Sequence, residues 1–290
     1  MKVRVIVNPV SGGGNGEVLA RSLCAALERR GAETVLTVTK APGDAGREAA
    51  MPGVDCVVAA GGDGTVRETA NGLRGTGTPL AIFPLGTANA VAAQLKIPND
   101  PEELAALIAE KRIRDIDCGV HRGQYFLQSA GAGLDALIVR EVHARRGRRM
   151  SFSRYVAPVL RVVAAARLHP IRVTVDGRIL CENARYAVVS DCPYSAGVFA
   201  FTPDATPDDG VLDVCAFTDT RMPRLLVLAL ASLGRGFSGR RDVRYAKGSG
   251  ILLESVTGKP VALQIDGDPA GQLPASFTIA RRALSVVAPE

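Results

Sequence analysis

The chain has no tryptophan, and aromatic residues make up only 4% of its 290 residues. Proteins that bind single-stranded nucleic acid without sequence preference stack the bases on aromatic side chains. This composition argues against such a stacking platform, and we expect no nucleic-acid partner.

A long hydrophobic run is also missing. The longest apolar stretch, LLVLALASL at residues 225–233, is about half the ~20 residues that a membrane-spanning helix needs. The N-terminal sequence MKVRVIVNPV is typical of a strand and lacks the apolar region and cleavage site of a signal peptide. We therefore expect a cytoplasmic protein that is soluble or peripherally associated with a membrane.

No Cys-x-x-Cys pair occurs among the six cysteines, at positions 24, 56, 118, 181, 192 and 215. This scatter argues against a zinc site or a disulfide framework. It fits apolar core positions in a reducing compartment. The three histidines, at positions 121, 143 and 169, have no ligand spacing and are expected to be structural.

Positive charge is in excess, with 35 Lys and Arg against 29 Asp and Glu and a net charge of +6. Part of the excess forms two runs. They are Arg145, Arg146, Arg148 and Arg149, and, after the apolar stretch, Arg235, Arg240, Arg241, Arg244 and Lys247. Such runs suit an anionic membrane surface, nucleic acid is a competing partner, and each run alone also fits a solvated basic face.

The predicted secondary-structure pattern changes near residue 120. Before it, strands alternate with helices, which are predicted at 17–30, 44–51, 66–73, 88–95 and 101–110. After it, β patterns dominate, with hairpins at Asp176-Gly177 and Asp266-Gly267 and helical stretches at 151–168 and 222–234. This order predicts a parallel α/β domain followed by a β-rich domain.

Residues 57–73, VVAAGGDGTVRETANGL, form the most informative stretch. An apolar run ends in the loop Gly61–Thr65 and a helical segment follows, with Thr65 and Glu68 spaced as a capping box that sets the start of the helix. Glycines let backbone N–H groups approach an anion closely, and the start of a helix adds donors and a positive dipole end. The stretch suits a nucleotide phosphate, but a strand–turn–helix corner without a ligand explains the glycines equally well.

The common phosphate loops are absent. The chain contains neither G-x-x-x-x-G-K-[ST] nor G-x-G-x-x-G. The run SGGGNG at 11–16 comes close to the second pattern, but Glu17 stands where its last glycine would be. The phosphate interpretation therefore needs support from elsewhere in the chain.

Two similar corners provide that support. Residues 3–12, VRVIVNPVSG, and residues 80–95, LAIFPLGTANAVAAQL, each predict a buried strand, a turn of small or hydroxyl residues and a helix. Parallel sheets bind ligands at the carboxyl ends of their strands. We therefore expect Asn8, Ser11, Gly61–Thr65 and Thr87 to line one crevice, although Thr87 alone fits an ordinary N-cap.

Acidic residues crowd the loop at 204–213. Its aspartates are Asp204, Asp208, Asp209 and Asp213. Carboxylate and carbonyl oxygens are the ligands of Mg²⁺ and Ca²⁺, but from the residues alone a polar turn at Asp209-Gly210 is the better explanation.

Two further aspartates stand out by their place in the sequence. Asp268 follows the turn Asp266-Gly267, which plain turn chemistry also explains. Asp63 is the second, because a carboxylate inside a phosphate loop is unfavourable unless it serves a metal, an acceptor hydroxyl or the loop structure.

Six segments together resemble one family. NPVSG, GGDGTVRETANGL and PLGTANAVAAQL look like the bacterial diacylglycerol kinase-like lipid kinases, which are related to sphingosine kinases. RDIDCGVHRGQYFLQSAGAGLDA (114–136), FTPDATPDDGVLDVCAF (201–217) and LQIDGDPAGQLPASFTI (263–279) resemble later parts of the family in order and spacing. The match covers essentially the whole chain. GGDGT alone also fits NAD kinases, whereas the six segments in order are highly specific.

The resemblance implies an enzyme that uses ATP and Mg²⁺ to phosphorylate a lipid hydroxyl. It implies an α/β plus β architecture: a doubly wound, Rossmann-like α/β nucleotide-binding domain at 1–122, to which 280–290 return, and a β-sandwich-like domain at 123–279. The family's active site lies between the two domains. The expected partner is a lipid met through peripheral contact with an anionic membrane surface, and the resemblance leaves room for a homodimer.

The resemblance also assigns roles to residues. Nucleotide contacts carry over to Asn8, Pro9, Val10, Ser11, Gly12, Thr39, Gly61, Gly62, Asp63, Gly64, Thr65, Val66, Arg67 and Thr87. A structural Mg²⁺ carries over to Asp209, with backbone carbonyls near Thr206 and Val211. The general base, usually Glu, carries over to Asp268, and in the sphingosine kinase branch the aspartate matching Asp63 faces the lipid hydroxyl. We rank Asp268 first as the base and regard Asp63 as essential, with its role open.

The chain departs from the family at several positions. Arg67 replaces Asn, Ala90 replaces Asp, Asp268 is one methylene shorter than Glu, and the glycine-rich turn at 196–198 is thinned. Two other functions therefore stay open. They are an NAD kinase-type phosphotransferase and a catalytically weak lipid- or nucleotide-binding protein.

Overall fold

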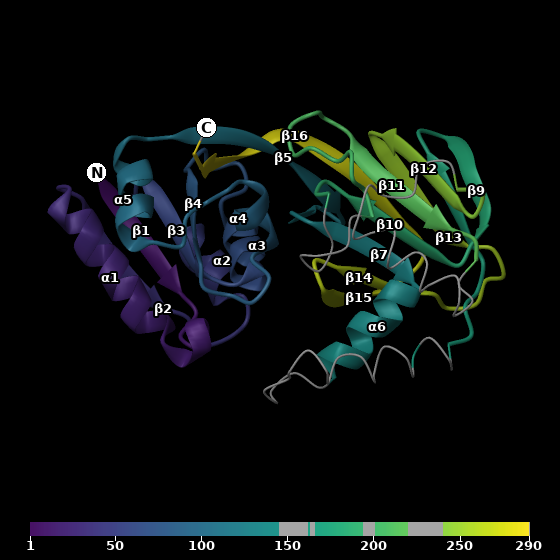
Figure 1. Ribbon diagram of the computed structural model, residues 1–290, viewed down its shortest axis with the longest axis horizontal. Helices are drawn as coiled ribbons and strands as arrows, with labels where there is room; N and C mark the ends of the chain where they lie inside the picture. The colour runs from purple at the N-terminus through teal and green to yellow at the C-terminus, as the bar shows by residue number, and fades with distance from the viewer. Residues whose placement is uncertain (145–161, 163–165, 194–200, 220–239, 290) are drawn as a thin grey trace. The chain divides into compact units, whose positions relative to one another are not determined.

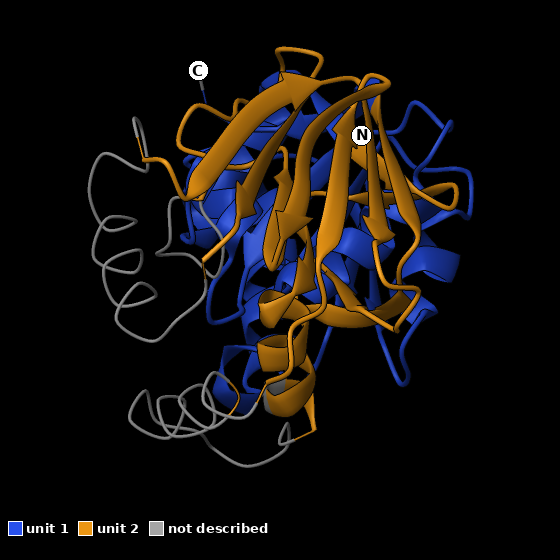
Figure 2. Cartoon of the chain, turned by 90° about the vertical axis from the view of Figure 1, so that its right-hand side faces the viewer, with its two compact units in different colours: residues 1–118, 280–290 blue, residues 119–279 orange. Residues whose placement is uncertain are grey.

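The computed structural model describes residues 1–144, 162, 166–193, 201–219 and 240–289. The chain divides into two compact units, unit 1 with residues 1–118 and 280–290 and unit 2 with residues 119–279 (Figure 2). From the sequence, the boundary is expected between 122 and 123. The arginine run at 145–149, most of the helical stretch 151–168, the stretch 222–234, Arg235 and the turn at 196–198 lie outside the described residues.

Parallel strands form the centre of unit 1. They are β1 (Lys2–Val7), β2 (Glu33–Val38), β3 (Cys56–Gly61) and β4 (Leu80–Pro84), in the order β2-β1-β3-β4, and β16 (Ala275–Val287) pairs with β4 through its C-terminal part. β3, with the sequence CVVAAG, is buried along its whole length. A strand inside a parallel sheet is covered on both faces, so a continuous apolar run folds as a strand here.

Helices alternate with these strands. They are the 3₁₀ turn η1 (Gly12–Gly14), α1 (Gly16–Arg29), α2 (Asp44–Ala49), α3 (Asp63–Gly72), α4 (Ala90–Gln94) and α5 (Pro101–Ala109). Figure 1 shows α1 and α5 on one face of the sheet and α2, α3 and α4 on the other. The doubly wound α/β architecture is therefore confirmed.

The helix starts show where local signals succeed and fail. The Asp100 carboxylate caps α5 by accepting the N–H groups of Glu102 and Glu103. By contrast, α3 begins at Asp63, so the capping box predicted from Thr65 and Glu68 is wrong. The Glu68 carboxylate instead accepts the N–H of Gly43 at 2.9 Å.

Unit 2 contains two β-sheets. The first has the order β16-β13-β8-β9, with β13 (Gly250–Ser255), β8 (Ile171–Val175) and β9 (Arg178–Ala184), and β5 (Ile113–His121) and β6 (Gln124–Phe126) extend from β16. The second has the order β12-β11-β10-β7-β14-β15, with β12 (Val243–Gly248), β11 (Leu212–Phe217), β10 (Tyr186–Ser190), β7 (Ser129–Gly133), β14 (Ala262–Ile265) and β15 (Asp268–Gln272). Helix α6 (Leu134–His143) follows β7.

An apolar core joins residues of both sheets in unit 2. β10 contributes Ala187 and Val189 to this core, while Tyr186 and Val188 belong to a second cluster with Phe217. This alternation is the period of two expected for a strand whose faces pack differently. The β-sandwich-like architecture is therefore confirmed.

The two predicted hairpin turns are also present. Asp176 and Gly177 have φ angles of 46° and 78°, and Asp266 and Gly267 have 47° and 79°. Positive φ at both central residues is what a type I′ turn requires, which explains the Asp-Gly pairs. All six cysteines are free and buried, in agreement with core positions.

Candidate active site

Three strand–turn–helix corners lie at the carboxyl ends of β1, β3 and β4. Asn8 donates its N–H to the carbonyl of Ala60 (3.0 Å), which links the first corner to the second. Leu85 links the third corner to both, because it accepts the N–H of Gly12 (2.7 Å) and donates to the carbonyl of Gly61 (2.9 Å). Backbone hydrogen bonds therefore bring together the loops expected to share one crevice.

The glycine loop turns directly into α3. Gly62 is the N-cap and has no side chain that could accept the first N–H groups of the helix, among which the N–H of Asp63 is hydrogen-bonded to the carboxylate of the same residue. A Cβ at Gly86 would lie 2.5 Å from the Gly62 Cα, so the two loops approach this closely because residue 86 is a glycine. Gly64 is exposed, whereas the side chains of Thr65 and Val66 are buried. A nucleotide would meet these last two residues through their backbone.

Asp63 has a partner within unit 1. Its Oδ1 accepts the N–H of Ala90, the first residue of α4, at 2.8 Å. Burial raises the pKa of Asp63, and the hydrogen bond from Ala90 opposes that rise. This hydrogen bond connects the second corner to the third. A contribution to the loop structure is one of the roles that the sequence leaves open for Asp63.

The other nucleotide candidates surround the same corners. Thr39 follows β2 and donates its N–H to the carbonyl of Val7 (2.9 Å). Asn8 Oδ1 accepts the N–H of Val10 (3.2 Å), whose side chain is 76% exposed. Thr87 is exposed in the third loop and is not an N-cap, since Asn89 holds that position in α4. The remaining candidates, Pro9, Ser11, Gly12 and Arg67, are partly buried.

Asp268 begins β15, directly after its hairpin turn. The Asp266 carboxylate fixes this turn by accepting the N–H groups of residues 127–129 at 3.0, 3.0 and 3.1 Å. His143 Nδ1, near the end of α6, lies 3.5 Å from Asp268 Oδ1, and the Asp268 side chain is 29% exposed. The base candidate is accessible and held in place. Its histidine neighbour was missed, because sequence spacing gives no sign of the contact.

A buried amide connects the same turn to α6. Gln264 donates Nε2 to Asp135 Oδ2 (2.7 Å) and accepts the N–H of Gly267 at Oε1 (2.8 Å). Gly131 leaves room for this carboxylate, because a Cβ there would collide with Asp135 Oδ2. Burial raises the pKa of Asp135 to about 6, and the Gln264 hydrogen bond opposes the rise. This network was also missed, since a buried Gln in a strand has no distinctive motif.

Asp135→Asn should remove a pH dependence of folding stability. Between about pH 4 and pH 6 folded Asp135 keeps a proton that the unfolded chain releases, so the free energy of unfolding falls as pH rises through this window. One pKa unit corresponds to ~1.4 kcal/mol, so the variant should gain at most ~3 kcal/mol at neutral pH. Urea unfolding from pH 4 to pH 7 measures the slope.

Asp176→Asn provides a control of opposite sign for that experiment. Hydrogen bonds from the Gly250 and Ser249 backbone lower the pKa of Asp176, so its contribution is present at neutral pH and lost on acidification. If Asp135→Asn keeps the wild-type slope, the carboxylate is not held in an unfavourable charged state.

A lysine occupies the acidic loop where a metal was expected. Lys247 Nζ, from β12, donates to the Asp204 carbonyl (2.6 Å) and to Asp209 Oδ2 (2.9 Å), and lies 3.3 Å from Asp213 Oδ2. Burial lowers the pKa of Lys247, but the Asp209 and Asp213 carboxylates outweigh it and the pKa is raised. Asp209 Oδ1 accepts the N–H of Val211 (3.2 Å), which is ordinary turn chemistry.

These groups do not fit a Mg²⁺ ion while the ammonium is in place. Two like unit charges 4 Å apart repel by about 4 kcal/mol at an effective dielectric constant of ~20, and a divalent ion would double that before solvent screening. In the ranges that the structure describes, no group of three or more His, Cys, Asp or Glu could hold a metal. Lys247 thus occupies one oxygen of the site expected from Asp209, Thr206 and Val211, and that site stays a prediction.

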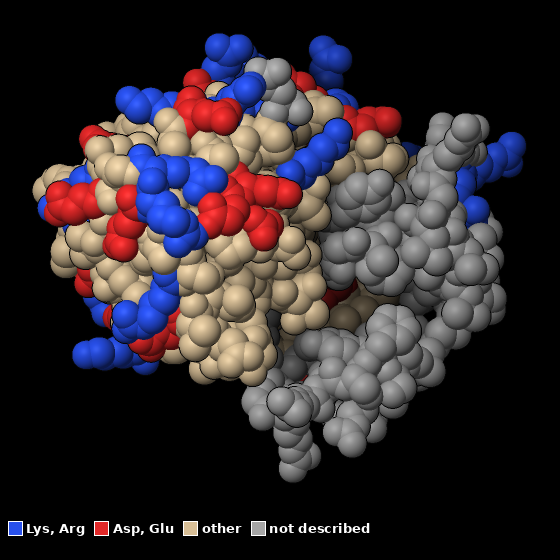
Figure 3. Space-filling model, turned by 60° about the vertical axis from the view of Figure 1, so that its left-hand side comes forward, with Lys and Arg blue, Asp and Glu red and all other residues tan. Residues whose placement is uncertain are grey.

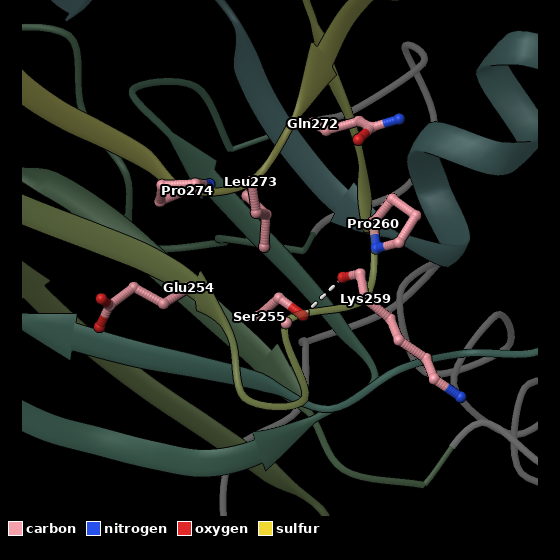
Figure 4. Close-up of a pocket in the computed structure, with 8 residues that line it drawn as sticks. Glu254, Ser255, Lys259, Pro260, Gln272, Leu273 and Pro274 are labelled. Atoms are coloured by element: carbon pink, nitrogen blue, oxygen red, sulfur yellow. Dashed lines mark hydrogen bonds between the residues drawn. The ribbon is translucent and has the colours of Figure 1, made fainter.

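A surface pocket of about 430 Å³ in unit 2 is separate from these residues (Figure 4). Its lining comprises Glu254, Ser255, Gly258, Lys259, Pro260, Gln272, Leu273 and Pro274. Ser255 Oγ donates to the Lys259 carbonyl (2.6 Å), which closes the turn beside the pocket. The lining includes none of the predicted site residues and assigns no chemistry.

The described surface carries both signs of charge. Figure 3 shows acidic and basic side chains intermixed on one face. Within the second basic run, Arg240 Nε lies 3.5 Å from Asp242 Oδ1, while Arg241 and Arg244 are exposed. Within the described ranges, each helix is too short or too polar to be a candidate for a membrane span.

Comparisons with known proteins cover the whole chain. The family model "Diacylglycerol kinase catalytic domain" matches residues 2–121, and "YegS C-terminal NAD kinase beta sandwich-like domain" matches residues 128–288. A diacylglycerol kinase of Bacillus subtilis strain 168 is 27% identical over 298 residues, which covers 100% of this chain and 97% of the relative. A diacylglycerol kinase of Staphylococcus aureus strain JH9 is 29% identical over 297 residues, covering 99% and 92%.

Solved structures show the same fold. A crystal structure of a diacylglycerol kinase from Bacillus anthracis strain Sterne matches with a TM-score of 0.76 at 23% identity, covering 99% of this chain and 97% of the other. A second structure from the same organism matches with a TM-score of 0.81 at 25% identity and the same coverage.

Proposed function

Because this chain belongs to the diacylglycerol kinase-like family of lipid kinases, we propose that it transfers the γ-phosphate of ATP to a hydroxyl group of a diacylglycerol-like or sphingoid lipid. The main observation in support of ATP binding is the junction of three loops at the carboxyl ends of β1, β3 and β4. At this junction the N-cap of α3, Gly62, has no side chain to accept the first N–H groups of the helix. Such a junction suits a polyphosphate.

The glycine loop receives the phosphates in this proposal. The N–H groups of Gly62, Gly64 and Thr65 bind phosphate oxygens, and Asn8, Ser11 and Thr39 line the nucleotide from the neighbouring corners. Mg²⁺ bound together with ATP would neutralise charge on the phosphate oxygens. Asp63 keeps the third loop in position through the N–H of Ala90.

Asp268 acts on the acceptor. Its carboxylate takes the proton of the lipid hydroxyl as the hydroxyl oxygen forms a bond to the γ-phosphorus, and the bond from that phosphorus to the bridging oxygen of ADP breaks. Three observations support this role of Asp268. Its side chain is partly exposed, the turn before it is held by hydrogen bonds to Asp266, and His143 lies beside it. We assign His143 a positioning role.

A transfer screen with ³²P-labelled ATP tests the function. Diacylglycerol, monoacylglycerol, ceramide, sphingoid bases and NAD are offered in turn, and we expect label in at least one lipid. Label in NAD alone would instead identify an NAD kinase-type enzyme. Absence of transfer to every acceptor, with ATP still bound, would leave a binding protein.

The same assay with the lipid in vesicles of different charge tests for membrane contact. We propose peripheral contact with an anionic membrane, supported by the exposed side chains of Arg241 and Arg244, so acceptor in anionic vesicles should react faster than in neutral ones. Equal rates would argue against this contact.

We also propose a homodimer. Sedimentation equilibrium should then give twice the 30.3 kDa mass of the chain.

A further inference from the structure

We propose that the ammonium group of Lys247 is the permanent counter-cation of the loop at 204–213 and takes the place of a bound divalent metal ion. The inference concerns how unit 2 is held together and does not depend on the proposed phosphotransfer. It rests on where the lysine is placed, on the number of oxygens around it and on the burial of one carboxylate.

The sheet itself fixes the position of Lys247. β11 and β12 pair in antiparallel register, and Lys247 lies directly opposite Asp213. Opposite charges in such a cross-strand pair attract, and their backbones are already ordered. The ammonium therefore enters the loop from a rigid strand, unlike a lysine on a mobile surface segment.

The ammonium meets oxygens from three points of the chain. They are the carbonyl of Asp204 before the turn, the carboxylate of Asp209 in the turn, and the carboxylate of Asp213 in β11, at 2.6, 2.9 and 3.3 Å. Two of these contacts, to the Asp204 carbonyl and to Asp209, are hydrogen bonds from the ammonium, whereas Asp213 Oδ2 accepts no hydrogen bond and is paired with the ammonium by charge. Carboxylate oxygens are also ligands that Mg²⁺ would use, and here the lysine has engaged Asp209, the one carboxylate of the expected metal site.

One of these carboxylates needs a partner of opposite charge. The Asp213 side chain is only 1% exposed, and its Oδ1 accepts the hydroxyl of Tyr245. A buried carboxylate is stable only when it is paired and hydrogen-bonded. Lys247 supplies the opposite charge beside Oδ2 and Tyr245 donates the hydrogen bond to Oδ1, so the charge of Asp213 is balanced without a metal.

The wild-type protein provides the first test. Mn²⁺ is added without nucleotide and followed by electron paramagnetic resonance, and thermal unfolding is recorded with Mg²⁺ or EDTA at constant ionic strength. We expect no stoichiometric Mn²⁺ binding that depends on Asp209, and the same unfolding midpoint in all conditions. Stoichiometric Mn²⁺ binding that Asp209→Asn abolishes would overturn the proposal.

A pair of matched variants provides the second test. Lys247→Met keeps the aliphatic stem and removes the charge, so the unfolding midpoint should fall by several degrees, and Mg²⁺ should raise it again because the loop oxygens are released. Arg244→Met removes a charge from the same strand at an exposed position and should change the midpoint little. A Lys247→Met midpoint equal to that of wild type would contradict the proposal, and if this variant does not fold, the wild-type Mn²⁺ measurement still decides.

Discussion

Asp268→Asn should give a folded protein whose turnover is roughly 10²–10⁴ lower than that of wild type, the range expected for loss of a general base. Asparagine keeps the size of the side chain but cannot take the proton of the acceptor hydroxyl. The turn before Asp268 is held by the Asp266 carboxylate and by Gln264, so the substitution leaves those contacts in place. ATP affinity should be nearly unchanged, because the nucleotide contacts belong to other residues.

Two variants sharpen this result. Asp268→Glu should retain activity, because it restores the residue usual in the family. Asp63→Asn keeps an oxygen that can accept the N–H of Ala90, so the loop should stay in place. If Asp268→Asn turns over at the wild-type rate while Asp63→Asn loses turnover and still binds ATP, Asp63 is the base.

Gly62→Asp should weaken ATP binding by roughly 10³-fold without unfolding unit 1. A carboxylate about 4 Å from a phosphate charge costs about 4 kcal/mol at an effective dielectric constant of ~20, and each 1.4 kcal/mol is a factor of about ten in Kd. Gly62 has φ −91° and ψ −175°, which any residue adopts, and Asp is a favoured N-cap. The substitution should therefore leave α3 folded and weaken only the binding of the ATP phosphates.

Gly62→Asn is the matched control, since it adds almost the same bulk without charge. A new Cβ would lie 3.3 Å from the Gly86 Cα, so both variants require the same small shift of the third loop. Isothermal titration with ATP measures the two affinities. Wild-type affinity in a folded Gly62→Asp variant would remove the glycine loop from the nucleotide site.

Much of unit 1 follows from local sequence. The helices expected at 17–30 and 101–110 are found at Gly16–Arg29 and Pro101–Ala109, because apolar spacing and, for the second, the Asp100 cap and Pro101 specify them without help from distant residues. The three corners could be placed together for a similar reason. Buried parallel strands bring their carboxyl ends to one edge of a sheet, so their loops become neighbours wherever they occur in the sequence.

Contacts between distant segments could not be predicted in this way. The spacing of Thr65 and Glu68 matches a capping box, but the end of β3 and the close approach of Gly62 to Gly86 fix the helix start earlier, and Glu68 finds a partner at Gly43. Local spacing carries no information about such packing.

The surroundings of the acidic loop depend on strand register. Lys247 belongs to a run of basic residues that suggested a surface feature, and its place opposite Asp213 follows only from the pairing of β11 with β12. His143 approaches Asp268 because α6 packs beside β15, which its sequence position does not reveal.

Direct measurement of phosphate transfer in one preparation tests the central claim most closely. Wild-type protein is incubated with ATP labelled at the γ-phosphate and with vesicles of the lipid found in the acceptor screen, and label extracted with the lipid is counted beside that of Asp268→Asn and Gly62→Asp. The account predicts rapid labelling of the lipid by wild type, slow labelling by Asp268→Asn and almost none by Gly62→Asp when ATP is limiting. Equal labelling by all three proteins, or ATP binding by wild type with no labelled lipid, would contradict it.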